Sequence, residues 1–221
     1  MADKEILIFV EGPSDKVFLE AYLYFLEDIP IKNFKVKDVT GKDNLSKRLL
    51  EIEKYDKTLI IFDADKDYES NKKEILSKTQ QKITEEQIFL FPNNQDDGDL
   101  ETLLLEIAKH DEFLKCFEGY LECIKSKEHY KPIKNIRKNM LYAYLEVFEL
   151  QKFFQYKWDT NNKKNEENII IDDKGKIKEK HKEEYEKLKE VIDFSLNSLI
   201  PLKNFLGQFA ENKQKTKLKI F

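Results

Sequence analysis

Apolar and polar residues alternate in blocks along the first half of the chain. Short apolar runs rich in β-branched and aromatic residues predict strands, and the segments between them show the apolar spacing or charge mixture of helices. The predicted strands are residues 5–10, 34–39, 58–62 and 87–91, and the predicted helices are residues 14–28, 44–55 and 69–82. Strands that alternate with helices favour an α/β fold, with a mostly parallel sheet flanked by helices.

Beyond residue 100 the apolar spacing becomes helical. It predicts a helix over residues 99–110, with Asp99 as its N-cap, and a long aromatic-rich helix over residues 135–155. We therefore expect an α/β core over residues 1–110 and a helical C-terminal extension over residues 111–221.

Within this extension, residues 159–183 are rich in lysine, asparagine and glutamate. This composition predicts a mobile charged loop, with a short hairpin around residues 172–175. Residues 192–209 are apolar again, and we expect them to pack back onto the body of the protein. The aromatic residues just before the loop, Phe153 to Trp158, are interpreted as core, although they could also stack on nucleic-acid bases.

The two cysteines, Cys116 and Cys123, lie about two helical turns apart in a predicted helix, roughly 10 Å, which is too far for a disulfide. We expect them to be buried thiols in a reducing compartment. No apolar run approaches the roughly 20 residues that a membrane span needs, and no charged start leads into an apolar segment. The expectation is a soluble cytoplasmic protein with no membrane partner.

Acidic residues gather where the predicted strands end. They are Glu11 and Asp15 after the first strand, Asp63, Asp65 and Asp67 after the third, and Glu101 after the fourth. Sites in open α/β sheets lie outside the carboxyl ends of the strands, so these side chains are candidates for one site. Asp96, Asp97 and Asp99 are interpreted as turn and cap residues.

Carboxylates crowded in this way require a partner. At 4 Å two like charges repel by about 4 kcal/mol at an effective dielectric constant of 20, and a bound divalent cation reverses the sign of that interaction. Ligand sets made only of oxygen suit Mg²⁺, Mn²⁺ or Ca²⁺ better than zinc. The simpler interpretation of Asp63, Asp65 and Asp67 is a solvated loop whose carboxylates never meet.

Two other metal sites also match part of the pattern. An EF-hand loop starting at Asp63 would end at Glu74, but it would place Tyr68 where the turn wants glycine, after a strand rather than a helix. A haloacid-dehalogenase-like phosphatase also has Asp-x-Asp after a strand, with the first Asp as nucleophile. It gives no role to Glu11, and its motif has Thr where this chain has Asp67.

The order VEGPSD, Val10–Asp15, followed by a strand ending in DADKD, Asp63–Asp67, resembles the Toprim domain. That domain has a Glu-Gly after its first strand and an Asp-x-Asp after a later one. Glu11 and Gly12 match the first motif and Asp63 and Asp65 the second. The later segments FPNNQDDGDLETLLLEI, RKNMLYAYLE and FSLNSLIPLKNFL resemble a DUF3226-type group of Toprim proteins related to the overcoming-lysogenization-defect (OLD) nucleases.

The resemblance implies a nuclease that cleaves DNA or RNA with Mg²⁺ or Mn²⁺, plausible in phage defence or nucleic-acid processing. Its primary metal ligands would be Glu11, Asp63 and Asp65. The other candidate ligands are Asp15, Asp67 and Glu101. OLD-like nucleases also use a basic residue from outside the core sheet, and Lys138 is the candidate here, with Arg137 and Lys134 behind it. No GxxxxGK[ST] loop occurs, so an ATPase would have to be a separate chain. The non-enzymatic alternative is a Toprim module that binds metal, nucleic acid or a partner ATPase without cutting.

The distribution of charge along the chain bears on the choice between a nuclease and a binding module. The net charge is only −4, but residues 1–125 contain 28 acidic and 18 basic residues, whereas residues 126–221 contain 15 and 21. An acidic first part beside a basic second part could place a metal site next to a phosphate-binding surface, although surplus lysines also simply keep a helical surface hydrated. Phosphate affinity comes from Lys and Arg, so the acidic first part would need cations or a basic partner to bind a duplex tightly.

Overall fold

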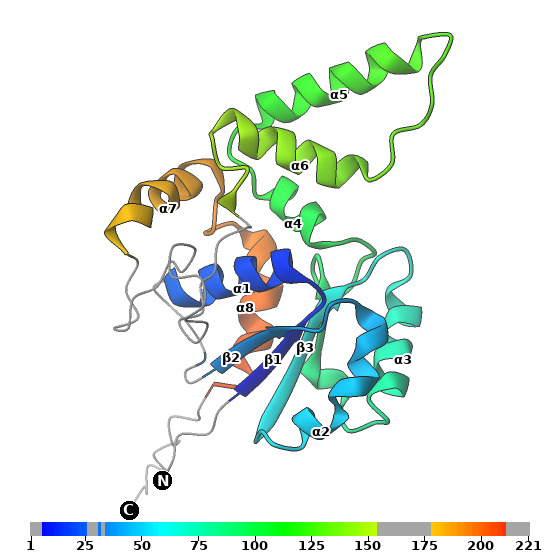
Figure 1. Cartoon of the computed structure of the whole chain (residues 1–221), viewed down its shortest axis with the longest axis vertical. Helices are drawn as coiled ribbons and strands as arrows, with labels where there is room; N and C mark the ends of the chain where they lie inside the picture. The colour runs from blue at the N-terminus through cyan, green and yellow to red at the C-terminus, as the bar shows by residue number, and fades with distance from the viewer. Residues whose placement is uncertain (1–5, 26–30, 32–33, 154–177, 211–221) are drawn as a thin grey trace, which may run out of the picture.

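Four parallel strands form one sheet in the spatial order β2-β1-β3-β4 (Figure 1). The computed structural model describes residues 6–25, 31, 34–153 and 178–210. The strands are β1 (Ile6–Val10), β2 (Phe34–Asp38), β3 (Lys57–Asp63) and β4 (Ile88–Phe91). The predicted α/β fold with a parallel sheet is confirmed.

Helices cover the sheet and form the C-terminal part. The α-helices are α1 (Pro13–Phe25), α2 (Leu49–Ile52), α3 (Tyr68–Lys78), α4 (Leu100–Glu106), α5 (Asp111–Lys125), α6 (Ile136–Val147), α7 (Glu179–Val191) and α8 (Ile200–Gly207). The 3-10 helices are η1 (Lys42–Arg48), η2 (Glu85–Gln87) and η5 (Asn197–Leu199). Every helix in the described part of the chain is too short or too polar to cross a lipid bilayer.

The two faces of the sheet contribute side chains to two different apolar clusters, because successive side chains of a strand point to opposite faces. In β1, Ile6, Ile8 and Val10 point into the cluster that contains α1, whereas Leu7 and Phe9 point into the cluster that contains α3. Both faces are therefore covered, as buried parallel sheets require.

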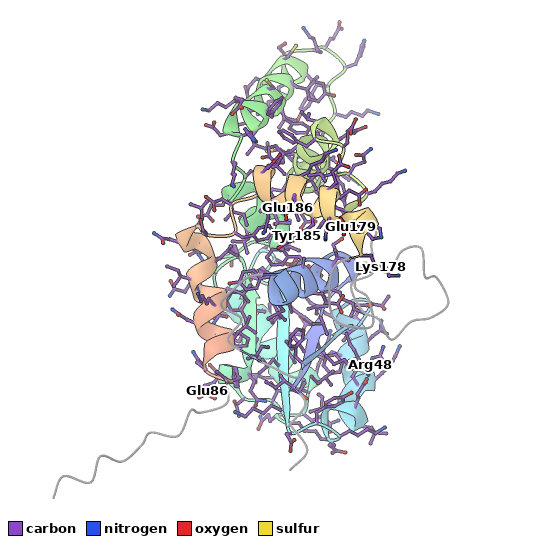
Figure 2. All side chains as sticks on the ribbon, turned by 90° about the vertical axis from the view of Figure 1, so that its left-hand side faces the viewer. Arg48, Glu86, Lys178, Glu179, Tyr185 and Glu186 are labelled. Atoms are coloured by element: carbon purple, nitrogen blue, oxygen red, sulfur yellow. The ribbon has the colours of Figure 1, made fainter. Side chains whose placement is uncertain are left out.

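The helical extension continues the cluster on the α1 side. Side chains of α6, α7 and α8 join α1 and the sheet in a single buried group. Figure 2 shows α7 lying over α1, and Tyr185 and Leu188 of α7 are buried there. The described residues of the 192–209 segment therefore pack onto the body, as the sequence predicted.

Tyr144 ties two parts of the extension together. Its side chain is buried and its hydroxyl donates to the Val191 carbonyl across 2.6 Å. We expect Tyr144→Phe to lower the free energy of unfolding by about 1 kcal/mol. The hydroxyl's bond to Val191 and the longer bond of 3.4 Å that it accepts from His110 N–H are lost, while Lys109 N–H still satisfies the Val191 carbonyl. Urea denaturation measures the change, and Tyr120→Phe at an exposed site should leave the stability unchanged. Equal effects at the two sites would contradict this role for Tyr144.

Three local predictions were wrong. The helix predicted over 44–55 is a 3-10 helix followed by one short α-helix. The helix predicted over 135–155 ends at Val147, because Glu149 adopts a left-handed conformation (φ 61°) and Leu150 N–H closes onto the Leu145 carbonyl. The helix predicted over 69–82 ends at Lys78, just before two left-handed residues.

The prediction that Cys116 and Cys123 are buried was also wrong, since both thiols are free and exposed. They lie outside the apolar stripe of α5, which consists of the half-buried residues Leu114, Phe117, Leu121 and Ile124. Phe153 is buried in the core as expected. Residues 154–177, which contain Trp158, most of the predicted charged loop and the predicted hairpin, lie outside the described residues. The last residues predicted as loop, from Glu179, belong to α7.

Candidate functional site

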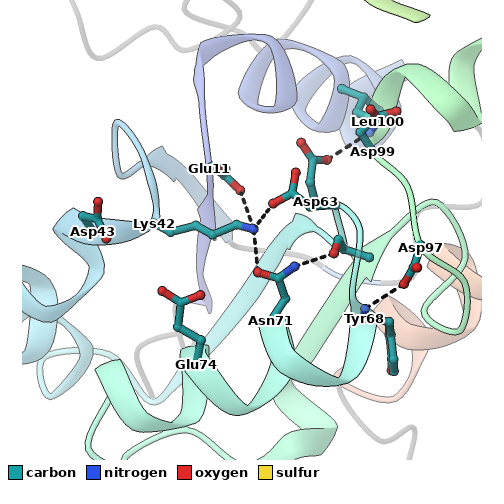
Figure 3. Close-up of polar contacts among 12 residues, drawn as sticks. Glu11, Lys42, Asp43, Asp63, Tyr68, Asn71, Glu74, Asp97, Asp99 and Leu100 are labelled. Atoms are coloured by element: carbon teal, nitrogen blue, oxygen red, sulfur yellow. Dashed lines mark hydrogen bonds and ion pairs between the residues drawn. The ribbon is translucent and has the colours of Figure 1, made fainter. Parts of the chain in front are cut away.

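The ends of β1 and β3 bring Glu11 and Asp63 together (Figure 3). These strands are parallel neighbours, and their register places Val10 beside Ile61, so both carboxylates leave the sheet at its carboxyl edge. The backbone of Asp63 lies close enough to the Glu11 carboxylate to lower the pKa of that group, against the effect of burial. Two residues 52 positions apart in the sequence thus share one small space.

Asp15 joins them from the first turn of α1. It is 8% exposed, and its Oδ2 accepts a hydrogen bond of 2.8 Å from the backbone N–H of Gly12. The tight turn between β1 and α1 therefore holds this carboxylate against the strand ends. Its charge is close enough to that of Glu11 and Asp63 for the groups to repel one another.

Burial makes these negative charges costly. Loss of solvent, together with repulsion from Asp15 and Glu11, raises the pKa of Asp63 to about 9. Burial likewise raises the pKa of Asp15 to about 7 and raises that of Glu11, although Lys42 opposes the shift at Glu11. Buried acidic groups with strongly shifted pKa values in one place are typical of functional sites.

The loop after β3 does not continue in the extended conformation that would align all three aspartates. Asp65 adopts a left-handed conformation (φ 53°), and its backbone N–H donates to the Gly98 carbonyl across 2.7 Å. Aspartate is one of the few residues other than glycine that adopt this conformation readily. Asp65 is thereby turned toward Lys42, and its side chain is 55% exposed.

Asp67 caps helix α3 by accepting a hydrogen bond of 2.9 Å from Ser70 N–H. This contact accounts for the third aspartate without a metal. Because β3 rather than a helix precedes the loop, the EF-hand alternative is wrong. Asp97 and Asp99 serve as turn and cap residues, as predicted: Asp97 accepts from Tyr68 N–H and Asp99 from Thr102 N–H.

Lys42 is the site residue that the sequence analysis missed. It begins η1 after β2. Its ammonium donates to Asp65 Oδ2 and, across 2.8 Å, to Asn71 Oδ1, and it lies 3.9 Å from Glu11 Oε2 (Figure 3). Asn71 in turn donates to the Ala64 carbonyl. The available signal was the pair Gly41–Lys42 in a loop after a predicted strand, at the edge where Glu11 and Asp63 were already expected.

The fourth strand contributes through helix α4. Leu100 N–H, at the start of α4, donates to Asp63 Oδ1 at 2.9 Å. Glu101 is in the first turn of this helix, and its charge raises the pKa of both Asp15 and Asp63. Glu101 thus lies beside the other carboxylates rather than serving only as a favourable charge at a helix start.

The helical extension reaches the site through Arg137 rather than Lys138. Arg137 Nε lies 3.0 Å from both carboxylate oxygens of Asp99, and its Nη2 lies 2.7 Å from Oδ2. The pKa of Arg137 is raised first by this hydrogen bond and further by the charges of Glu101 and Asp63. Lys138 lies over the ring of Tyr142, 6.0 Å from its centre.

The donor chemistry of this edge suits a divalent cation. The carboxylates offer oxygen ligands only, and the buried Oε2 of Glu11 has no hydrogen-bond partner among the described residues. In their present positions, no three His, Cys, Asp or Glu side chains of the described residues could hold one ion. The residues that would hold it are Glu11, Asp63 and Asp65, and Lys42 now lies between the first and the last of these.

An open hollow of about 510 Å³ adjoins this edge. Lys66, Tyr68 and Lys72 line it, together with Asn94 and Asp97. The ammonium of Lys72 lies 5.6 Å from the centre of the Tyr68 ring. Asp67 and Glu69 line the hollow as well, so its acidic residues outnumber its two lysines and it offers no surplus of positive charge to a nucleic-acid strand.

These features define an α/β protein whose parallel sheet has an acidic site at its carboxyl edge and a helical part that reaches that site. The chain belongs to the family described as "Protein of unknown function (DUF3226)", whose profile matches residues 5–199. Neither a curated protein nor a solved structure shows significant similarity to it.

Proposed function

We propose that this chain is a divalent-metal-dependent nuclease of the Toprim, OLD-like type, which cleaves phosphodiester bonds of DNA or RNA in the cytoplasm. The observation that carries the proposal is the meeting of Glu11 with Asp63 at neighbouring strand ends, where both carboxylates are largely buried and have raised pKa values. A fold does not by itself maintain such an unfavourable group of charges, and a cation site explains it.

Mg²⁺ or Mn²⁺, when bound, would supply an activated water and neutralise charge at the phosphorus atom. Glu11, Asp63 and Asp65 would hold the ion, and Asp15 and Glu101 lie near enough to orient ligands or to assist a second ion. The Leu100 N–H fixes one oxygen of Asp63 and leaves the other available.

The substrate phosphate requires positive charge beside these carboxylates. Arg137 provides it from the extension, because its guanidinium is 54% exposed while it pairs with Asp99. Its planar fork matches a phosphate as well as a carboxylate. We therefore propose Arg137 ahead of Lys138 as the basic residue of the extension that contacts the scissile region.

A cleavage assay with plasmid, single-stranded DNA and RNA tests this function. We expect cutting with Mg²⁺ or Mn²⁺ and none with EDTA. Glu11→Gln should lower the rate by at least about 100-fold, because it removes one charged ligand from the ion. Glu118→Gln on α5, distant in sequence and exposed, serves as the matched control and should cut at the wild-type rate.

Other outcomes separate the alternatives. Metal binding without cutting of any substrate, also in the presence of a partner ATPase, would favour the non-catalytic module. Turnover of phosphate monoesters that is lost in Asp63→Asn but kept in Glu11→Gln would favour the phosphatase.

A further inference from the structure

Lys42 is held in the acidic site by the loop that precedes it. Gly41 has a φ of 97°, and its N–H donates to the backbone carbonyl of Glu11 across 2.9 Å. This hydrogen bond fastens the loop after β2 to the end of β1. The side chain of the next residue, Lys42, therefore crosses from the end of β2 toward the end of β3 (Figure 3).

The ammonium of Lys42 lies among oxygen atoms from three different elements. It contacts Asp65 Oδ2, hydrogen-bonds to Asn71 Oδ1 at 2.8 Å, and lies 3.9 Å from Glu11 Oε2. The side chain is only 14% exposed. Asn71 is itself fixed by the Ala64 carbonyl, so the acceptor is in place independently of the lysine. A single positive charge surrounded by oxygen atoms resembles the environment of a bound cation.

We propose that Lys42 is a built-in counter-cation, which bridges Glu11 and Asp65 until a divalent ion displaces it. The inference rests on the proposed function, because the ion is the one that the nuclease would use. The ammonium bonded to Asp65 and 3.9 Å from Glu11 Oε2 stands in the space that an ion held by both carboxylates would fill. Lys42 thereby sets the concentration of divalent cation at which the site fills.

This role predicts opposite effects of one substitution. Lys42→Met keeps the length of the side chain and removes its charge. Without metal, Glu11 and Asp65 lose their shared partner, so the protein should melt at a lower temperature in EDTA. With metal, the competitor is gone, so Mn²⁺ should bind at least about tenfold more tightly, the change that corresponds to removing a competing interaction of about 1.4 kcal/mol.

Titration calorimetry of Mn²⁺ into the full chain tests the competition. Lys47→Met, an exposed lysine of the same 3-10 helix, is the matched control and should bind Mn²⁺ like the wild type. Unchanged or weaker binding by Lys42→Met would overturn the proposal, and weaker binding would mean that Lys42 positions the ligands.

Chemical labelling of the wild-type chain gives a readout that needs no substitution. Acetylation of Lys42 by acetic anhydride, measured by peptide mass spectrometry, should become severalfold faster when Mn²⁺ is added, while acetylation of Lys115 on α5 stays constant. No change at Lys42, or slower labelling, would overturn the proposal.

These results also separate the inference from the proposed function. Competition between Mn²⁺ and Lys42 without cleavage of any nucleic acid would refute the nuclease and leave the counter-cation in place. Cleavage of nucleic acid, together with an unchanged Mn²⁺ affinity in Lys42→Met, would support the nuclease and refute the counter-cation. Failure of both wild type and Lys42→Met to bind Mn²⁺ would refute the counter-cation and the metal dependence together.

Discussion

Replacing Asp63 by Asn is expected to stabilise the metal-free protein while abolishing metal-dependent cleavage. The carboxyl group of Asp63 is largely buried beside Asp15 and Glu11, and its pKa is raised from its usual value of 3.8 to about 9. Asparagine has nearly the same shape and can still accept the hydrogen bond from Leu100 N–H. Asparagine carries no charge, so the substitution removes the cost of burying the Asp63 carboxyl group and keeps its hydrogen bond.

The sign of the pH dependence follows from proton binding. Between about pH 4 and pH 9 the unfolded chain releases the proton of Asp63, whereas the folded chain retains it. The folded state then binds more protons, so the free energy of unfolding falls as pH rises through this window and levels off above it. The raised pKa of Asp15, about 7, acts in the same direction over a narrower range.

Urea denaturation in EDTA at pH 5 and at pH 8.5 measures this effect. At pH 8.5 we expect the unfolding free energy of Asp63→Asn to exceed that of the wild type by a few kcal/mol, because each unit of pKa shift corresponds to about 1.4 kcal/mol. At pH 5 the gap should narrow. Asp56→Asn, an exposed residue just before β3, should follow the wild type at both pH values. Parallel pH profiles for wild type and Asp63→Asn would contradict the buried charge.

Added Mg²⁺ should reverse the order of stability. A ligand that binds only the folded state stabilises it in proportion to its occupancy, so the wild type should gain stability and Asp63→Asn should gain little. The site would then be a place where the chain gives up stability to keep carboxyl oxygens in position for a cation. Lys42 offsets part of that cost at Glu11 and Asp65, which explains why a lysine belongs in a site otherwise built from carboxylates.

The parts of this site that the sequence predicts are those fixed by strand ends. Glu11 and Asp63 follow apolar runs, and parallel pairing must bring such ends to one edge. The positions of Asp15 and Glu101 follow from the same rule, because each lies in the first turn of a helix that leaves that edge. The parallel sheet itself is predictable from the alternation of strand and helix patterns.

The parts that the sequence does not predict depend on loop conformation. Lys42 reaches the site only because Gly41 N–H is bonded to the Glu11 carbonyl, a contact between residues 30 positions apart. The left-handed turn at Asp65 likewise depends on Gly98, which lies in another loop. Arg137 and Lys138 are adjacent in sequence, and only the packing of α6 decides which one reaches Asp99. Hydrophobic periodicity carries no information on such contacts.

A second large effect is expected far from the site, in the apolar cluster that joins the extension to the sheet. Leu206 of α8 is completely buried and belongs to the same cluster as α1, α4 and β4. Leu206→Ala should lower the free energy of unfolding by about 3 kcal/mol, because it removes apolar contacts and leaves a cavity that the surrounding helices fill only in part. Urea denaturation with a single transition is the measurement.

Leu50 provides a chemically matched control, since its side chain is 74% exposed on α2. Leu50→Ala should change the stability by less than about 0.5 kcal/mol. The number of transitions is equally informative. If the extension and the sheet unfold as one unit, Leu206→Ala shifts one transition detected equally by far-ultraviolet circular dichroism and by tyrosine fluorescence. Two separate transitions, of which Leu206→Ala shifts the first and leaves the second unchanged, would show that the extension folds independently of the sheet. Arg137 would then be brought to Asp99 by a mobile part of the chain and not by a shared core.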